Sequence, residues 1–307
     1  MRIVFFGTPE FAVPSLRALL REPYSVAGVV TQPDRPQGRS RTTLVAPPVK
    51  LEAERARIPV LQPERPLGDL FIAGLRRLEP DLGIVVAYGH ILRPSVLSLP
   101  RLGMINVHGS LLPRWRGAAP IQHAIAEGDA ETGVSIMQME EGLDSGPVLH
   151  RIATPIGTDE TAGALASRLA ELGATALVDA LSLMTAGFAK PEPQDAEGVT
   201  FAPKIDRDSA RLDWRRDAGA LARQVRAYDP SPGAWAMHDA APIKLFGAVS
   251  AAGHGEPGCV LVAGETLVVA CGNNSLVIRE VQPSGRTRLT VSDWVRGRGI
   301  AVGARLG

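Results

Sequence analysis

Cysteine is scarce in this chain of 307 residues, which contains only Cys259 and Cys271. The two do not form a C-x-x-C pair, and no cluster of cysteine and histidine surrounds them, so the sequence argues against a zinc site. Isolated cysteines in a chain of this length are typical of reduced, buried thiols in a cytosolic protein, with a disulfide between them as the alternative. We therefore expect a cytoplasmic protein that binds no metal.

Long hydrophobic runs are also missing. No stretch of about 18 consecutive apolar residues occurs, and a helix that crosses a membrane needs one. The sequence MRIVFFGTPEF at the start has an apolar run too short for a signal peptide, and Glu10 interrupts it. The sequence therefore predicts a protein that neither spans nor is targeted to a membrane.

Lysine is rare, since it accounts for only four of the 33 basic residues and arginine for the others. A codon-composition bias explains such a ratio, so the abundance of arginine is not by itself a sign of nucleic-acid binding. The net charge is +1, and hydrophobic residues make up 45% of the chain against 21% charged residues. That composition is sufficient to bury a core, and the length fits two ordinary domains or one large domain.

A glycine-rich dinucleotide motif is absent from the first predicted strand-to-helix turn. The segment FFGTPEF, residues 5–11, contains Gly7 alone where G-x-G-x-x-G is required. Asp34 follows the second predicted strand, but it comes after a proline and not at the strand end. We therefore expect no nicotinamide cofactor.

The first half of the chain alternates buried apolar runs with segments of helical periodicity. We predict strands at 2–7, 25–33, 81–89, 103–109, 131–140 and 147–156, and helices at 11–22, 48–57, 69–79 and 159–187, the last as one or two helices. This alternation is typical of a doubly wound, mostly parallel, Rossmann-like α/β sheet. We assign it to a first domain over residues 1–189.

The pattern changes after residue 189. Residues 190–204 contain three prolines and little periodicity, which predicts a linker. In residues 205–307 one predicted helix, 217–229, precedes five short β-like runs separated by glycine and proline, which is typical of a small closed β-barrel. This second domain carries a small excess of basic side chains.

The clearest chemical candidates lie near the end of the strand at 103–108. Asn106 and His108 are two residues apart on this strand, so their side chains project from the same face, and His108 stands at the carboxyl end, where ligands of open α/β sheets bind. The irregular loop from Ser110 to Gly117 follows. Pro113 restricts the backbone there, and we expect Ser110, Leu111 and Leu112 to present backbone N–H and C=O groups to a ligand.

Asp144 is the third candidate. It lies between Gly142 and Gly146, so it is either an ordinary turn residue or a carboxylate directed at His108. An amide, an imidazole and a carboxylate without a serine or cysteine nucleophile suit acyl transfer to an amine, because the substrate supplies the nucleophile. The protein then has to stabilise an oxyanion and move one proton.

These residues carry a family resemblance. The segments INVHGSLLPRWRGAAPIQHAI and GLDSGPVL resemble the signature of the folate-dependent formyltransferases. The segments FFGTPEFAVPSLRALL, TQPDRPQGR and GDAETGVSIMQM extend the resemblance along nearly the whole chain, to those members that act on aminoacyl-tRNA.

The resemblance implies that the chain transfers the formyl group of 10-formyltetrahydrofolate to the free amino group of initiator methionyl-tRNA, producing N-formylmethionyl-tRNA for translation initiation. It implies that Asn106, His108 and Asp144 are catalytic. It also implies that the folate site is lined by Ser110, Leu111, Leu112 and Pro113, and that 205–307 is an OB-like domain that binds tRNA. The donor is a co-substrate, and no metal is implied.

The segment from Asp34 to Pro48 is implied to contact the tRNA acceptor stem through Arg35, Arg39 and Arg41. Unstructured loops of about this length are usually functional or disordered. We expect this loop to lack structure of its own, to be mobile without tRNA and to become ordered with it.

Three alternatives stay open. An amino-sugar formyltransferase would share residues 106–117 but carry a different second domain, which the β-rich 205–307 disfavours. A nucleic-acid-binding module on an α/β scaffold would give Asn106, His108 and Asp144 no reason to coexist. A hydrolase would pass the formyl group to water. For the leading interpretation we expect a monomer.

Overall fold

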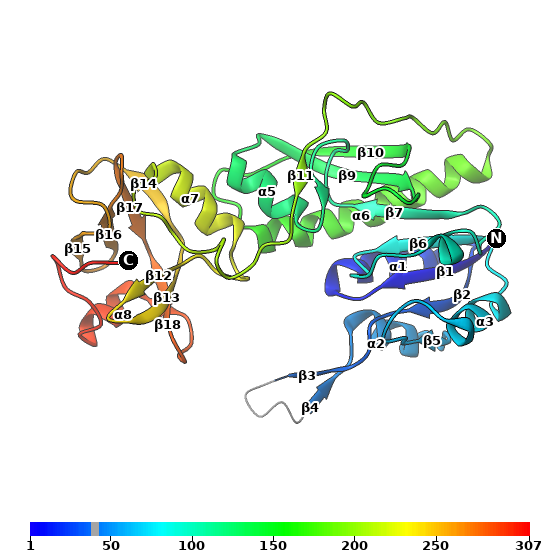
Figure 1. Cartoon of the computed structure of the whole chain (residues 1–307), viewed down its shortest axis with the longest axis horizontal. Helices are drawn as coiled ribbons and strands as arrows, with labels where there is room; N and C mark the ends of the chain where they lie inside the picture. The colour runs from blue at the N-terminus through cyan, green and yellow to red at the C-terminus, as the bar shows by residue number, and fades with distance from the viewer. Residues whose placement is uncertain (38–42) are drawn as a thin grey trace. The chain divides into compact units, whose positions relative to one another are not determined.

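The computed structural model describes residues 1–37 and 43–307, which form two compact units (Figure 1). The first comprises 1–117, 132–155 and 166–201, and the second comprises 118–131, 156–165 and 202–307. The units thus interleave along the chain, because two short segments before residue 190 group with the second unit. The division into a domain over 1–189, a linker over 190–204 and a domain over 205–307 stays a prediction about which parts fold independently.

A seven-stranded sheet forms the centre of the first unit, in the order β10-β9-β7-β6-β1-β2-β5. Its strands are β1 (Arg2–Gly7), β2 (Ser25–Val30), β5 (Val60–Leu61), β6 (Leu82–Val86), β7 (Met104–His108), β9 (Glu131–Gln138) and β10 (Val148–Pro155). The ladders β1–β2, β1–β6, β2–β5 and β6–β7 are parallel, whereas β7–β9 is antiparallel. The prediction of a mostly parallel Rossmann-like sheet is confirmed.

The helices of the first unit follow the predicted periodicity. They are η1 (Glu10–Ala12), α1 (Val13–Arg21), α2 (Pro48–Arg55), α3 (Asp69–Arg77), α4 (Pro94–Leu97) and most of α6 (Ala162–Thr185), of which the short α4 was not predicted. Pro14, Pro48 and Pro94 each lie in the first turn of a helix, where the missing N–H removes no helical hydrogen bond. The region 159–187 forms one helix, and Gly173 lets it approach the sheet, since a Cβ there would lie 3.0 Å from Val107 Cγ1.

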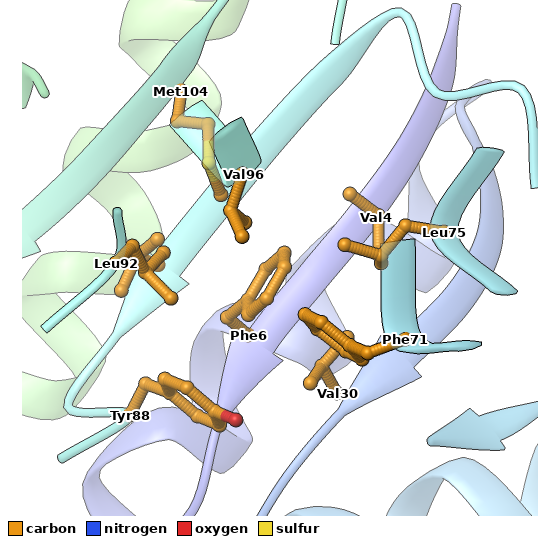
Figure 2. Packing of buried hydrophobic residues seen from close by; sticks show 10 residues of the cluster. Val4, Phe6, Val30, Phe71, Leu75, Tyr88, Leu92, Val96 and Met104 are labelled. Carbon is orange, nitrogen blue, oxygen red and sulfur yellow. The ribbon is translucent and has the colours of Figure 1, made fainter. Parts of the chain in front are cut away.

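The apolar core beside β1 explains why this sheet is stable. Every residue of β6 is buried, as expected for a parallel strand covered on both faces. Figure 2 shows the cluster in which Val4 and Phe6 of β1 pack with Phe71 and Tyr88. The rings of Phe6 and Tyr88 meet edge to face with centroids 5.4 Å apart, a favoured aromatic geometry.

We predict that Tyr88→Phe raises the free energy of unfolding by about 1 kcal/mol, because the hydroxyl is buried without a compensating hydrogen bond. Tyr88 is 1% exposed, and its oxygen has no partner among the described residues. Urea unfolding of both proteins at neutral pH measures the difference. A loss of stability in the variant would contradict the prediction.

The same hydroxyl gives a pH dependence. Burial raises the pKa of Tyr88 to about 12, above its ordinary value of 10.0. Because the hydroxyl ionises more easily in the unfolded chain, the free energy of unfolding is unaffected by this group below the unfolded pKa and falls as the pH rises towards the folded pKa. Between about pH 10 and 12 we expect the wild type to lose more stability than Tyr88→Phe, which urea unfolding across that range will show.

The second unit combines helices with two four-stranded antiparallel sheets. The first has the order β12-β13-β18-β19 and the second β14-β17-β16-β15. The elements are α5 (Pro120–Glu127), α7 (Ala218–Ala227), α8 (Val291–Arg296), β12 (Trp235–His238), β13 (Ala241–Phe246), β14 (Val249–Ala251), β15 (Val260–Ala263), β16 (Leu267–Ala270), β17 (Ser275–Ile278), β18 (Glu280–Pro283) and β19 (Leu289–Thr290). The predicted helix at 217–229 is α7, and the side chain of Asp217 caps its first turn.

The chain passes from one of these sheets to the other twice. Gly247, with φ of 61°, and Ala248 separate β13 from β14, and Arg279 separates β17 from β18. Two of the five predicted runs are therefore each two strands, because one or two residues re-direct the backbone within the run. The antiparallel β-rich character of this part of the chain is confirmed.

Across residues 1–37 and 43–307, none of the helices has the length and apolar character that a membrane crossing requires.

Candidate active site

Asn106 and His108 lie on β7, whose carboxyl end shares an edge with the parallel strand β6. The register pairs Val85 of β6 with Asn106. His108 is the last residue of β7. His108 is 6% exposed and Asn106 is half-buried. As predicted, both side chains project from one face of the strand at this edge. They therefore reach the same third residue.

That third residue is Asp144. Its Oδ1 lies 3.5 Å from Nδ2 of Asn106, and its Oδ2 lies 3.7 Å from Nδ1 of His108. Asp144 has a φ of 47°, in the left-handed region that aspartate tolerates better than most residues. The structure thus brings the three sequence-predicted residues together, with the carboxylate facing both the amide and the imidazole.

The turn that holds Asp144 is tied to two other loops. The backbone N–H of Gly117 donates to Asp144 Oδ2 at 2.9 Å. Nε2 of Gln194 donates to the carbonyl oxygens of Asp144 and Gly146, both at 2.8 Å. The guanidinium of Arg116 donates in turn to Oε1 of Gln194 at 3.0 and 2.8 Å. These hydrogen bonds hold both the carboxylate of Asp144 and the backbone of its turn in place.

Sequence reasoning did not identify Gln194 or Arg116 as parts of the site. Gln194 lies in the proline-rich segment 190–204, 50 residues after its partner Asp144. Neither local periodicity nor motif spacing marks such a contact. Only the fold shows that this segment passes beside the turn.

A second hydrogen bond orients the imidazole. Nε2 of His108 lies 2.9 Å from the carbonyl oxygen of Trp115. A carbonyl only accepts, so we assign the proton of the neutral ring to Nε2, which leaves Nδ1 facing Asp144. Trp115 has a φ of 64°, and this left-handed residue turns the loop so that its carbonyl reaches the ring.

The predicted folate loop is held by hydrogen bonds within the protein. Ser135 Oγ donates to the carbonyl of Ser110 at 2.7 Å and accepts from the backbone N–H of Leu112 at 3.0 Å. The carbonyl of Leu112 accepts from Arg151 Nε at 3.1 Å. The expectation that these backbone groups face a ligand is therefore wrong for the Leu112 N–H, which has a protein partner.

The side chains of the same loop divide into two kinds. Leu112 is buried with Met137 and Val148, so it anchors the loop to the sheet. Leu111 and Pro113 are half-buried. A lining role for Ser110, Leu111, Leu112 and Pro113 in a folate site stays a prediction.

The segment 34–48 is partly structured, contrary to the expectation of a loop without its own structure. β3 (Arg35–Gln37) and β4 (Thr43–Val45) form a two-stranded antiparallel ladder in its described part. Arg35 is exposed, with Nη2 3.6 Å from Glu64 Oε2. Arg39 and Arg41 lie outside the described residues, so the predicted mobility stays untested.

Other sequence-based expectations concern metals and thiols. In the part of the chain that the structure describes, no group of three or more histidine, cysteine or acidic side chains is placed to hold a metal ion. Cys259 and Cys271 are both free, and burial raises the pKa of the Cys271 thiol to about 11. The disulfide alternative is therefore wrong for this structure.

Comparison with known proteins adds to this geometry. Residues 1–181 match the family model described as formyl transferase, and residues 204–299 match the model described as formyl transferase, C-terminal domain. The chain is 53% identical over 310 residues to methionyl-tRNA formyltransferase of Stenotrophomonas maltophilia (strain K279a). That similarity covers 99% of this chain and 100% of the relative.

Two solved structures show the same fold. HypX from Aquifex aeolicus in complex with tetrahydrofolic acid superposes with a TM-score of 0.66 at 21% identity, over 97% of this chain and 47% of that one. An N-formyltransferase from Helicobacter canadensis in complex with folinic acid and dTDP-3-aminofucose has a TM-score of 0.66 at 14% identity, over 92% and 98% of the two chains. With both family models matched in order and one relative similar over its full length, the chain belongs to the methionyl-tRNA formyltransferase family.

Proposed function

We propose that the chain transfers the formyl group of 10-formyltetrahydrofolate to the free amino group of initiator methionyl-tRNA, producing N-formylmethionyl-tRNA for translation initiation. The observation that carries this proposal is the convergence of Asn106, His108 and Asp144 at the carboxyl edge of the sheet. It is an amide donor, an imidazole and a carboxylate within one site, which is the set that acyl transfer to an amine requires.

The residues have distinct roles in the proposed step. The donor supplies a formyl carbon bonded to a nitrogen that leaves as an amine. As the acceptor amine attacks that carbon, the Asn106 amide donates to the oxyanion of the tetrahedral intermediate. The nitrogens of the His108 ring face Trp115 and Asp144, so the ring stabilises the oxyanion electrostatically, through the positive charge that it carries during proton transfer. The C–N bond to the acceptor forms, the bond to the donor nitrogen breaks, and the proton lost by the acceptor is passed to the departing nitrogen.

Asp144 supports the proton transfer. Its carboxylate faces Nδ1 of His108, so it stabilises the charged form of the ring while a proton is in transit. The Trp115 carbonyl holds Nε2 at the same time, which keeps the ring plane fixed. Ser110, Leu111, Leu112 and Pro113 would hold the donor beside these groups.

The identity of the acceptor rests on a different observation. The fold alone does not separate acceptors, because the amino-sugar complex from Helicobacter canadensis shares it. The full-length identity of 53% to a methionyl-tRNA formyltransferase favours tRNA. We assign tRNA binding to the β-rich second unit and to the arginines Arg35, Arg39 and Arg41, and we infer a monomer that acts in the cytoplasm.

An acceptor comparison tests the proposal. The protein is incubated with formyl-labelled 10-formyltetrahydrofolate and one of three acceptors, namely initiator methionyl-tRNA, a nucleotide-linked amino sugar or water alone. We expect label in the aminoacyl ester only with methionyl-tRNA. Label in the amino sugar, or release of formate at the same rate without an acceptor, would replace the proposal by one of the alternative activities.

We predict that Arg39→Ala lowers kcat/KM for methionyl-tRNA about tenfold, the size expected for one charge-assisted contact to a phosphate. Steady-state kinetics at two salt concentrations measure this loss, and the salt dependence should weaken by about one phosphate contact. The Kd for the folate donor should not change. The exposed Arg76 on α3 provides the control, and an equal loss in Arg76→Ala would show that the effect is one of net charge.

A further inference from the structure

The base of the hairpin formed by β3 and β4 is closed by an ion pair. Asp34 immediately precedes β3, and Lys50 lies in the first turn of α2, shortly after β4. Nζ of Lys50 donates to both carboxylate oxygens of Asp34, at 2.9 and 2.7 Å. The side chains are 19% and 28% exposed, so this pair is more enclosed than most surface pairs.

Gln62 connects this pair to the edge of the sheet. Its Nε2 donates to Asp34 Oδ1 at 2.8 Å and to the carbonyl of Gln32 at 2.9 Å. Nε2 of Gln32 donates to the carbonyl of Tyr88 at 3.1 Å, which also accepts from Thr8 Oγ1 at 3.0 Å. The network therefore joins the residues that follow four strands.

The strands concerned are β1, β2, β5 and β6, which are parallel to one another, so their carboxyl ends meet at one edge. β7, which ends at His108, is parallel to β6 and ends at the same edge. The hairpin base is thus hydrogen-bonded to the edge of the sheet that carries the candidate active site. Figure 1 shows the hairpin extending from there away from the rest of the first unit.

We propose that Asp34, Lys50 and Gln62 form a clamp that fixes the direction in which the hairpin leaves this edge, and that this orientation sets the affinity for the tRNA acceptor. The inference rests on the proposed function. The three are positioning residues, since they act through the hairpin and its arginines. We call them the Asp34 clamp.

The hairpin needs such an anchor because it has little stability of its own. Its two strands have three residues each, and the side chains of Thr43, Leu44 and Val45 are all exposed. A two-stranded hairpin is marginal in water, so its direction depends on what holds its base. When only a fraction of molecules presents a binding surface correctly, the apparent affinity falls by that fraction.

The alternative interpretation is that the ion pair of Asp34 and Lys50 only holds α2 in place. A second ion pair on the same helix allows a test of this alternative. Glu52 of α2 accepts from Arg17 of α1 at 2.8 Å, away from the hairpin base. Hydrogen bonds from Gln62 and Lys50 lower the pKa of Asp34, and a bond from Arg17 lowers the pKa of Glu52, so both acids are held as carboxylates. Glu52→Gln is therefore the matched control.

The experiment compares Lys50→Met, Asp34→Asn and Glu52→Gln in the full-length protein with methionyl-tRNA and 10-formyltetrahydrofolate. We expect Lys50→Met and Asp34→Asn to raise KM for methionyl-tRNA about tenfold. This is the rise expected when about one tenth of the molecules hold the hairpin in the orientation that binds tRNA. kcat and the Kd of the donor should stay at the wild-type values, as should every constant of Glu52→Gln. The double variant should be no worse than either single one, since both remove the same contact.

Lys50→Arg, which keeps the charge, should have a wild-type KM, and the unchanged kcat and donor Kd show that each variant is folded. An unchanged KM in Lys50→Met and Asp34→Asn, beside a raised KM in Arg39→Ala, would overturn the clamp and leave the hairpin contact in place. An equal rise in Glu52→Gln would overturn it in favour of a role in fixing α2. An unchanged KM in the clamp variants and in Arg39→Ala would overturn both the inference and the proposed tRNA contact.

Discussion

Replacing His108 or Asn106 with alanine is expected to lower kcat for formyl transfer by about 10²–10³-fold, the usual cost of removing one group that stabilises the oxyanion. Both side chains belong to the strand β7 and converge on Asp144. Each substitution therefore removes a group that acts on the developing charge. Because that charge exists only in the transition state, the loss should appear in kcat and kcat/KM together. The Kd of the donor should change little.

The comparison is made by steady-state and single-turnover kinetics with methionyl-tRNA. His150→Ala is the matched control, because His150 also lies on a strand of the first unit beside an aspartate, with Nε2 3.6 Å from Asp179. Its kcat should equal that of the wild type. Turnover near the wild-type value in His108→Ala would remove the imidazole from the mechanism, whatever the stability of the variant.

Replacing Asp144 with asparagine is expected to lower kcat by a similar factor of about 10²–10³, because the imidazole loses its charged partner. Asparagine has the same shape, and its side-chain oxygen still accepts a hydrogen bond, so the contact with Gly117 N–H at 2.9 Å can be kept. The backbone carbonyl of residue 144 still accepts from Gln194. The variant therefore tests the charge and not the turn.

The ratio kcat/KM should fall together with kcat in Asp144→Asn, because the missing charge acts on the transition state. Asp179→Asn, which changes an exposed carboxylate elsewhere in the first unit, should leave kcat and kcat/KM at the wild-type values. Wild-type values of both constants in Asp144→Asn would contradict the assigned role.

The sequence predicts those parts of the fold that depend on local pattern. The strands from Arg2 and Leu82 are buried on both faces, so their apolar runs mark them as parallel strands. The barrel-like unit is harder to predict, because only Gly247 and Ala248 divide one apolar run into β13 and β14. Periodicity detects burial, whereas the division of a run between two sheets depends on backbone angles.

The candidate site shows the same limit. Asn106 and His108 were predictable because alternate residues of a strand share a face, and Asp144 because glycines on both sides mark a turn. Ser135 and Gln194 were not, since each acts on a residue at least 23 positions away along the chain. The clamp residue Gln62, 28 positions from Asp34, belongs to the same class.

The central claim is tested most directly by a single-turnover measurement with formyl-labelled 10-formyltetrahydrofolate, excess enzyme and initiator methionyl-tRNA. Base hydrolysis of the aminoacyl ester then releases the amino acid for identification. The result expected here is one label per tetrahydrofolate formed, recovered as N-formylmethionine, at a rate that falls by about 10²–10³-fold in His108→Ala. Tetrahydrofolate formed with the label recovered as formate, or labelled N-formylmethionine formed equally fast by His108→Ala, would contradict it.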